Sequence, residues 1–316
     1  MLSRRRVVRA GLGMLAVGAL GGCGQIPPGQ SVDPRTASPT PTKATRTPYV
    51  ASDEQAARLR SLQATLQASR ASVSAWKGTP AQASALDWAI GVAAEQRGAL
   101  GVVAGPSPTP AAGSVPAASV KKQLDADAAY YRGLASGGQQ PSAALWAAMA
   151  AWCQIAGAAV TAGNVRVQAL GQGRATLPAS AAPQDAGNDA LAACHQVVYG
   201  LPVAISVGGW SKPDLEAVGV RLNAWANLRD ALVDAITSLP GTPIAPQPYY
   251  QLKAPASAAA ARGVVGGLQA AALPHLAVAL DSGPASVRPT LAAAVGQITY
   301  DLTRWGTPVP RWPGLS

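Results

Sequence analysis

The stretch from Ser211 to Gly241 carries the clearest amphipathic pattern in this 316-residue chain. Its apolar residues recur every three or four positions: Leu215, Val218, Leu222, Trp225, Leu228, Leu232 and Ile236. This spacing places them on one face of an α-helix, and such a face must be buried against other elements. Ser211-Lys212-Pro213-Asp214 resembles a capping box in which aspartate replaces the usual glutamate. The pattern therefore predicts one long amphipathic helix packed within a larger assembly.

Similar apolar periods predict further helices along the chain. They cover about 52–76, 80–100, 120–134, 142–170, 191–205, 256–280 and 286–305. Thr79-Pro80 supplies an N-cap with proline at the first helical position, and Pro202 should bend the helix that contains it. No alternating run is long enough to indicate a sheet. We expect an all-α fold, an antiparallel helical bundle with a four-helix domain over 183–316, preceded by additional helices over 51–175.

Composition limits how such helices can pack. Only 13% of the residues are charged, 48% are hydrophobic, largely alanine, and there is no phenylalanine. Much of the bulk must therefore come from tryptophans: Trp76, Trp88, Trp146, Trp152, Trp210, Trp225, Trp305 and Trp312. A ligand pocket or glycan platform is an alternative use of these rings, but their helical spacing favours the core. Trp305 and Trp312 flank a proline-rich tail, which we expect them to hold against the bundle.

The first 22 residues are predicted to be a lipoprotein signal peptide. Four arginines lie within the first nine residues, and the 13 positions 10–22 carry no charge. That run suits a signal peptide and is shorter than the ~20 residues that span a bilayer. Leu20-Gly21-Gly22-Cys23 resembles a lipobox, so Cys23 is the expected lipidation site, and two acyl chains there would anchor the protein stably. The arginines also resemble a twin-arginine export signal. An ordinary secretory peptide or an uncleaved short anchor remains the alternative.

Residues 23–50 are expected to form a disordered tether, because they are rich in proline, serine and threonine and poor in apolar residues. Loss of the leader would leave 21 basic against 15 acidic residues, a net charge of +6. This modest charge is not clustered, so no nucleic-acid partner is predicted. The leader and tether together predict a lipid-anchored protein on the extracytoplasmic face of the cell membrane.

Residues 185–315 resemble the ferritin-like domain-of-unknown-function family found in secreted bacterial lipoproteins. Three short motifs carry this resemblance: Cys194-His195-Gln196-Val197-Val198-Tyr199-Gly200, Pro248-Tyr249-Tyr250-Gln251-Leu252 and Pro310-Arg311-Trp312-Pro313-Gly314-Leu315. The resemblance implies a four-helix ferritin-like bundle and no particular activity. Cys194 stands where the family has glutamate, which argues against a carboxylate-based role at that helix.

A metal site is not predicted in this ferritin-like region. Catalytic bundles of this type hold two metals with inward glutamates and two Glu-x-x-His motifs. The chain has only three glutamates, and the residue three positions after each is alanine or glycine; they are Glu54, Glu95 and Glu216. With only two histidines, His195 and His275, neither a di-iron site nor a Ser-His-Asp set is expected. We predict no cofactor and no catalytic centre.

The cysteines and aspartates leave some alternatives open. Cys153 and Cys194 both fall on apolar helix faces, and we predict a disulfide between them, with two inert buried thiols as the alternative. Cys194 should face the core and His195 its edge, because neighbours in a helix point in different directions. His275 is expected to be a partly buried polar residue. A buried cluster among five aspartates would indicate an unrecognised enzyme: Asp125, Asp127, Asp214, Asp230 and Asp301.

These observations favour a non-catalytic, membrane-anchored binding or structural protein of the cell envelope. Its partner would be an unknown envelope protein, lipid or other ligand. The alternatives are a small-molecule-binding lipoprotein associated with a transporter, and an envelope enzyme with an unrecognised site. An extended exposed helix face would favour the envelope protein that binds a partner. A large apolar cavity between bundles would favour small-molecule binding.

Overall fold

The predicted all-α architecture is confirmed by a computed structural model that describes residues 51–103, 114–139, 142–163, 175–252 and 254–315. Within these ranges there are eight α-helices, one 3₁₀ helix and no β-strand. The predicted signal peptide, the tether and Cys23 lie outside the described residues. The helices are α1 (Asp53–Ala71), α2 (Pro80–Ala99), α3 (Ala117–Ser136), α4 (Ala143–Ala162), α5 (Pro183–Ile205), α6 (Lys212–Thr237), α7 (Ala258–Ser282), the 3₁₀ helix η1 (Ala285–Val287) and α8 (Arg288–Trp305).

Helix starts follow the capping chemistry of the sequence. Ser52 and Thr79 each form a complete capping box, with Gln55 and Gln82 respectively, and Pro80 lies in the first turn of α2 as predicted. At α6 only half of the predicted box is present. The Ser211 hydroxyl accepts a hydrogen bond from the Asp214 backbone, whereas the Asp214 carboxylate bonds to neighbouring helices. The capping pattern therefore predicted the start of α6 correctly. It did not predict that the Asp214 carboxylate pairs with arginines of other helices.

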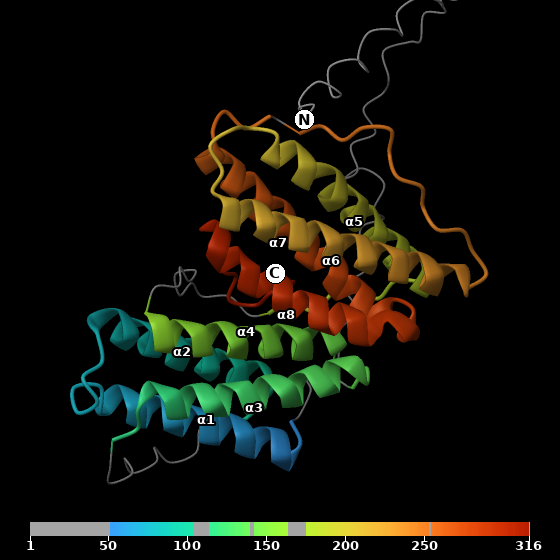
Figure 1. The fold of residues 1–316 in the computed structure, drawn as a ribbon. Coiled ribbons are helices and arrows are strands. Elements are labelled where there is room, and N and C mark those ends of the chain that lie inside the picture. Colours follow the sequence, from blue (N-terminus) through green and yellow to red (C-terminus); the bar gives the residue numbers. More distant parts are fainter. Residues whose placement is uncertain (1–50, 104–113, 140–141, 164–174, 253, 316) are drawn as a thin grey trace, which may run out of the picture. The chain divides into compact units, whose positions relative to one another are not determined.

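The first four helices form one bundle (Figure 1). In it, α1 packs on α2 and α3, and α4 packs on α3 and α2. Gln123 of α3 bonds to Ser61 of α1, and the Val115 backbone before α3 bonds to Ser72 after α1, so these two helices are antiparallel. Gln82 at the start of α2 bonds to the Thr161 carbonyl near the end of α4, which makes that pair antiparallel too.

Helices α5 to α8 form a second bundle with a long connection in its middle. In it, α5 packs on α6 and α7, and α8 packs on α7 and α6. Arg262, at the start of α7, reaches Asp214, at the start of α6, so those two helices run parallel. Arg304, at the end of α8, reaches the same aspartate, so α8 runs antiparallel to both. Residues 238–257 carry the chain back to the end at which α6 began (Figure 1).

The two bundles have the same pattern of neighbours. Each consists of two hairpins joined by a longer connection. Every pair of helices that packs together within α1–α4 has a counterpart within α5–α8, where α5 takes the place of α1 and α8 that of α4. Across the boundary α4 packs on α8, while α3 packs on α8 and α4 packs on α7. Because α3 is equivalent to α7 and α4 to α8, the α3–α8 and α4–α7 contacts are equivalent to each other. Two surfaces related by a two-fold axis contact each other in this way. The sequence patterns did not reveal this correspondence.

Polar contacts also join the bundles. The Ser142 hydroxyl, at the N-cap of α4, donates to the Asp281 carboxylate of α7 at 2.7 Å, and the Ala144 backbone N–H donates to the same group at 2.9 Å. A carboxylate at a helix N-terminus satisfies backbone donors and interacts favourably with the helix dipole. Residues 43–316 accordingly form one compact unit, although the sequence suggested separate regions on either side of residues 176–182.

The C-terminal tail also contacts both bundles. Val309, Arg311 and Trp312 are buried, and the Arg311 guanidinium donates to the Glu95 carboxylate of α2 at 2.7 Å. Gly314 has φ +81° and leaves no room for a side chain, because a Cβ there would lie 2.9 Å from the Leu273 carbonyl oxygen of α7. The expectation that Trp305 and Trp312 hold this tail against the bundle agrees with their exposures of 4% and 6%.

Most of the predicted core is buried. Six of the eight tryptophans are buried, and Trp76 and Trp210 are partly buried, as expected for core residues rather than an exposed platform. Two details differ from the sequence-based prediction. Leu215 was placed on the buried stripe of α6 but is 40% exposed, because it lies in the first turn. Helix α4 was expected to reach Leu170 but ends at Ala162, where Gly163 adopts φ +68°.

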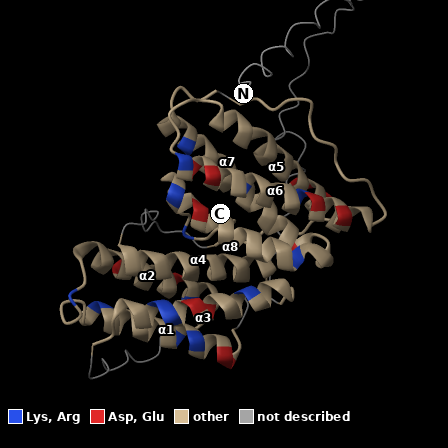
Figure 2. Ribbon diagram, in the orientation of Figure 1, with Lys and Arg blue, Asp and Glu red and all other residues tan. Residues whose placement is uncertain are grey.

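Among the described residues, two helices, α4 and α7, are long and apolar enough to cross a membrane by length and composition. In the most apolar 18-residue stretch of each helix, 89% is buried inside the protein for α4 and 50% for α7. Helix α4 contains no Lys, Arg, Asp or Glu, as the uncoloured ribbon in Figure 2 shows. Its burial explains this composition as that of a core helix, because charged side chains are rarely buried without partners.

The contact between Glu95 and Arg311 gives a first prediction. Replacing either residue alone, as in Glu95→Gln or Arg311→Met, should cost about 2–3 kcal/mol of unfolding free energy, because the remaining charge loses this contact in a largely buried position. The double variant should lose clearly less than the sum of the single losses. Urea denaturation of all four proteins measures this coupling, and additive losses would show that the pair does not connect the tail to α2.

Candidate functional site

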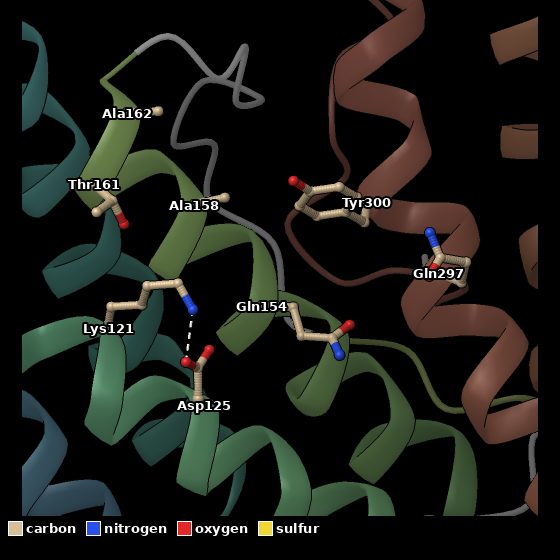
Figure 3. Close-up of a pocket in the computed structure, with 8 residues that line it drawn as sticks. All are labelled: Lys121, Asp125, Gln154, Ala158, Thr161, Ala162, Gln297 and Tyr300. Carbon is tan, nitrogen blue, oxygen red and sulfur yellow. Dashed lines mark hydrogen bonds and ion pairs between the residues drawn. The ribbon is translucent and has the colours of Figure 1, made fainter. Parts of the chain in front are cut away.

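A groove lies between α3, α4 and α8, where the two bundles meet. Its volume is about 460 Å³, within the usual range for small-ligand sites. Figure 3 shows Lys121 and Asp125 on one side, Gln297 and Tyr300 on the other, and Gln154 between them. Ala158, Thr161 and Ala162 complete the lining. The groove thus combines amide, hydroxyl, ammonium and carboxylate groups with methyl groups and one aromatic ring.

One face of α4 builds the floor of this groove. Gln154, Ala158 and Thr161 follow one another at spacings of four and three, which places them on the same side of the helix. Gln154 and Thr161 are the only Gln and Thr of an otherwise apolar helix. Sequence reasoning missed both residues, although two polar positions seven apart in such a helix were a signal that could have marked this face.

Gly296 of α8 lies against the Gln154 side chain of α4. A Cβ at Gly296 would lie 2.8 Å from Gln154 Oε1, which is closer than real Cβ atoms show, so the glycine leaves room for the amide. A Cβ at Gly157 would lie 3.5 Å from Lys121 Cγ, which is an ordinary van der Waals contact. The helices that frame the groove therefore pack closely at Gly296.

Charge within the groove is balanced. The Lys121 ammonium donates to the Asp125 carboxylate at 2.6 Å, and the remaining lining side chains are neutral. Beside the groove, Gln297 donates through Nε2 to the buried Asp301 carboxylate, which also pairs with Arg221 of α6 at 3.0 Å. Burial raises the pKa of Asp301, against the opposing effect of Arg221. This network fixes the position of Gln297.

The five aspartates proposed as a possible catalytic cluster are not brought together. Each pairs with its own basic residue: Asp125 with Lys121, Asp127 with Arg58, Asp214 with Arg262 and Arg304, Asp230 with Arg229, and Asp301 with Arg221. Asp127 is 3% exposed, and burial raises its pKa although Arg58 acts in the opposite direction. Only Asp125 lines the groove.

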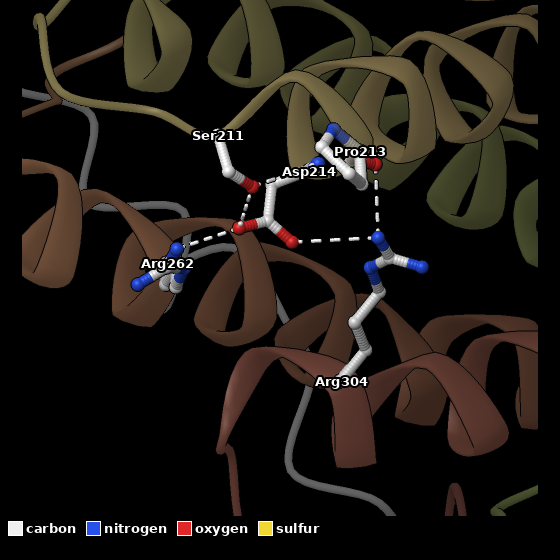
Figure 4. Close-up of polar contacts among 5 residues, drawn as sticks. All are labelled: Ser211, Pro213, Asp214, Arg262 and Arg304. Atoms are coloured by element: carbon white, nitrogen blue, oxygen red, sulfur yellow. Dashed lines mark hydrogen bonds and ion pairs between the residues drawn. The ribbon is translucent and has the colours of Figure 1, made fainter.

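Asp214 joins three helices at one end of the second bundle (Figure 4). Its carboxylate accepts hydrogen bonds from the Ser211 hydroxyl at 2.8 Å and from Arg262 of α7 at 2.6 Å, and it pairs with Arg304 of α8 at 3.4 Å. The hydrogen bond from Arg262 is the main reason that the pKa of Asp214 is lowered, with smaller contributions from Ser211 and Arg304. Its role is structural, since all its partners belong to the bundle.

The disulfide predicted between Cys153 and Cys194 is absent, and both are free buried thiols. Cys153 lies in α4, whose main neighbours are α3, α8 and α2, whereas Cys194 lies in α5, which packs on α7 and α6. The apolar faces that carry the two cysteines therefore belong to different bundles. Burial raises the pKa of Cys194 to about 12 and also raises that of Cys153 well above its usual value, so neither resembles an activated nucleophile.

The histidines have structural partners. Cys194 faces the core and His195, 9% exposed, lies at its edge, as predicted. His195 Nε2 lies 3.3 Å from the Ile244 carbonyl oxygen, and desolvation lowers its pKa. His275 Nδ1 lies 2.7 Å from the Asp189 carboxylate, which raises the pKa of His275. Among the described residues, no three or more His, Cys, Asp or Glu side chains are grouped to hold a metal ion.

Two of the short motifs that carry the family resemblance meet in space. Tyr199 lies 5.2 Å from Tyr250, between ring centroids, and Leu252 packs at Gly200, where a Cβ would come within 3.0 Å of it. His195 contacts the same connection through Ile244. The motif on α5 therefore fixes the course of the 238–257 connection over the bundle.

Replacing Asp214 tests its structural role. Asp214→Asn should lower the unfolding free energy by about 1 kcal/mol, because the arginine partners are half-exposed and solvent screens them. Since the pKa of Asp214 is lowered on folding, the difference should be present above the ordinary carboxyl range and shrink as pH falls through the lowered pKa. Urea denaturation at pH 6 and pH 3 measures it. Asp87→Asn, which removes one exposed ion pair with Arg70, is the control.

The buried thiols give a separate prediction. In a Cys23→Ser protein, native iodoacetamide treatment should leave Cys153 and Cys194 unmodified, and treatment after unfolding without reductant should modify both. Mass spectrometry of the peptides measures each step. Failure of alkylation in the unfolded, unreduced protein would reveal a disulfide, and rapid native modification would contradict the burial of these thiols.

Comparison with known families and proteins gives limited information. Residues 186–316 match the family described as "Domain of unknown function (DUF4439)". No curated protein and no solved structure matches the chain. The match covers the second bundle and the tail, so this part of the chain contains a domain similar to that family.

Proposed function

We propose that this chain is a membrane-anchored extracytoplasmic binding protein without a catalytic centre, and that the groove between α3, α4 and α8 holds a small polar ligand. The observation that carries the proposal is the groove itself, with its close-packed helical frame and convergent polar side chains. Amides and hydroxyls fixed on helices are suited to orient a ligand.

The anchored location rests on the leader. Its basic start, uncharged run and lipobox-like Leu20-Gly21-Gly22-Cys23 support lipidation at Cys23. A tether over 23–50 would then allow the helical body to move above the bilayer surface. The absence of charge from the 20 residues of α4 needs no membrane, because that helix packs inside the protein.

A binding role is better supported than catalysis. The residues whose pKa values are shifted, among them Asp127, Cys194, Asp214 and Asp301, lie in separate ion pairs or in isolated buried positions. For the second bundle we further propose a ferritin-like domain without a metal site. Its one long connection between α6 and α7 supports this assignment, since ferritin-like bundles have one such crossover.

A second candidate function is the docking of an envelope protein. Tyr199, Ile244 and Tyr249 are 38%, 40% and 68% exposed, and they lie on α5 and the 238–257 connection. Exposed aromatic residues are enriched at protein interfaces. We place this function second to ligand binding in the groove.

Native mass spectrometry of the detergent-extracted full-length protein tests the first proposal. Wild-type protein should carry a small bound species that is lost in Ala158→Leu, because the larger side chain fills the groove. Ala224→Leu, at an exposed position of α6, is the matched control and should retain the ligand. Cys23→Ala should also move the protein from the membrane to the soluble fraction. A bound species that is unaffected by Ala158→Leu would contradict the assignment of the groove.

A further inference from the structure

The chemistry of the groove restricts the class of ligand, provided that it is the binding site proposed above. Lys121 and Asp125 neutralise each other at 2.6 Å, and every other lining side chain is uncharged. An anionic ligand would have to compete with Asp125 for the lysine, and a cationic ligand would have to compete with Lys121 for the aspartate. The lining therefore carries no net charge, so neither an anion nor a cation gains a net electrostatic attraction from it, although the pair itself is exposed and weak.

The hydrogen-bonding groups suit a ligand that both donates and accepts. Gln154 and Gln297 each present an amide, with a carbonyl acceptor and an N–H₂ donor, and Tyr300 presents a phenolic hydroxyl. Figure 3 shows the hydroxyl end of Tyr300 directed from α8 toward α4. Hydroxyl groups of a ligand can pair with all of these, because each hydroxyl offers one donor and two acceptor positions.

The groove also has an apolar wall. Ala158 and Ala162 contribute methyl groups four residues apart on one face of α4, and Tyr300 contributes a half-exposed ring. A sugar ring has hydroxyls around its edge and C–H groups on its faces, so it can use the wall and the polar groups together. A volume of about 460 Å³ is sufficient for one or two such rings.

We infer that the groove between α3, α4 and α8 binds a neutral carbohydrate of one or two rings, with the ring packed between Tyr300 and the Ala158–Ala162 face of α4. The Gln154 and Gln297 amides bond its hydroxyls, and the Asp301 network holds Gln297 in position. Lys121 and Asp125 bond further hydroxyls without separating.

Ligand-observed NMR and calorimetric titration of the full-length protein in detergent test this inference. The probes are glucose, mannose, N-acetylglucosamine, maltose and cellobiose, with glucose 6-phosphate and glycylglycine as charged and zwitterionic counterparts. At least one neutral sugar should bind, and the phosphorylated sugar and the dipeptide should bind at least about tenfold more weakly. Tyr300→Ala and Gln154→Ala should each weaken sugar binding about tenfold or more. Tyr249→Ala, which removes an exposed tyrosine outside the groove, should leave it unchanged.

Several outcomes would overturn the inference. Tighter binding of glycylglycine or glucose 6-phosphate would show that the ligand is charged, and sugar binding that survives Tyr300→Ala and Gln154→Ala would place it elsewhere. Both variants alter exposed or half-buried side chains, and an unchanged circular dichroism melting curve establishes that they fold. If no neutral sugar binds while native mass spectrometry still detects a species displaced by Ala158→Leu, the carbohydrate assignment fails and the binding function stands. If neither is observed, both fail.

Discussion

The close packing of α4 against its neighbours is the constraint on which the rest of the structure depends. This helix carries no charged residue and lies at the boundary of the two bundles, where small residues bring α3 and α8 near to it. Buried alanines and glycines contribute little bulk, so Trp146 and Trp152 fill the space on its other sides. Trp146 stacks on Tyr131 of α3, with ring centroids 5.8 Å apart, and Trp152 lies 6.1 Å from Trp88 of α2. Dense packing of this kind leaves helices little freedom to shift.

Because the two bundles share one arrangement of helices, corresponding positions in them can be compared. The first hairpin connection of each bundle carries a tryptophan close to the N-cap of the following helix, Trp76 before Thr79 and Trp210 before Ser211. The tail adds a contact that belongs to neither bundle alone, since Arg311 reaches α2 and Gly314 lies on α7. The groove forms at the same boundary. Its lining residues come from both bundles, which explains why no single helical stripe indicated it.

Prediction from the sequence was most successful for local structure. The helix starts at Thr79 and Ser211 followed from capping residues, whose hydrogen bonds connect positions only three apart. Prediction failed where a partner is distant in the chain. The apolar surroundings of Cys153 and Cys194 indicated burial correctly, but an apolar face does not specify which helix covers it, and the predicted disulfide was therefore wrong. Asp214 shows the same limit, because its partners lie 48 and 90 residues away.

By itself, the sequence determined that the chain is helical, where most helices begin, and which faces are buried, because period and capping are local properties. It also supplied the charge-free character of α4 and the basic leader. The tertiary structure decided how the helices are paired, that two bundles share one arrangement, and that Gln154, Gln297 and Tyr300 converge on one groove. The groove joins Gln154 to Gln297 and Tyr300, which lie more than 100 residues further along the chain, and helical periodicity does not encode which helices pack together.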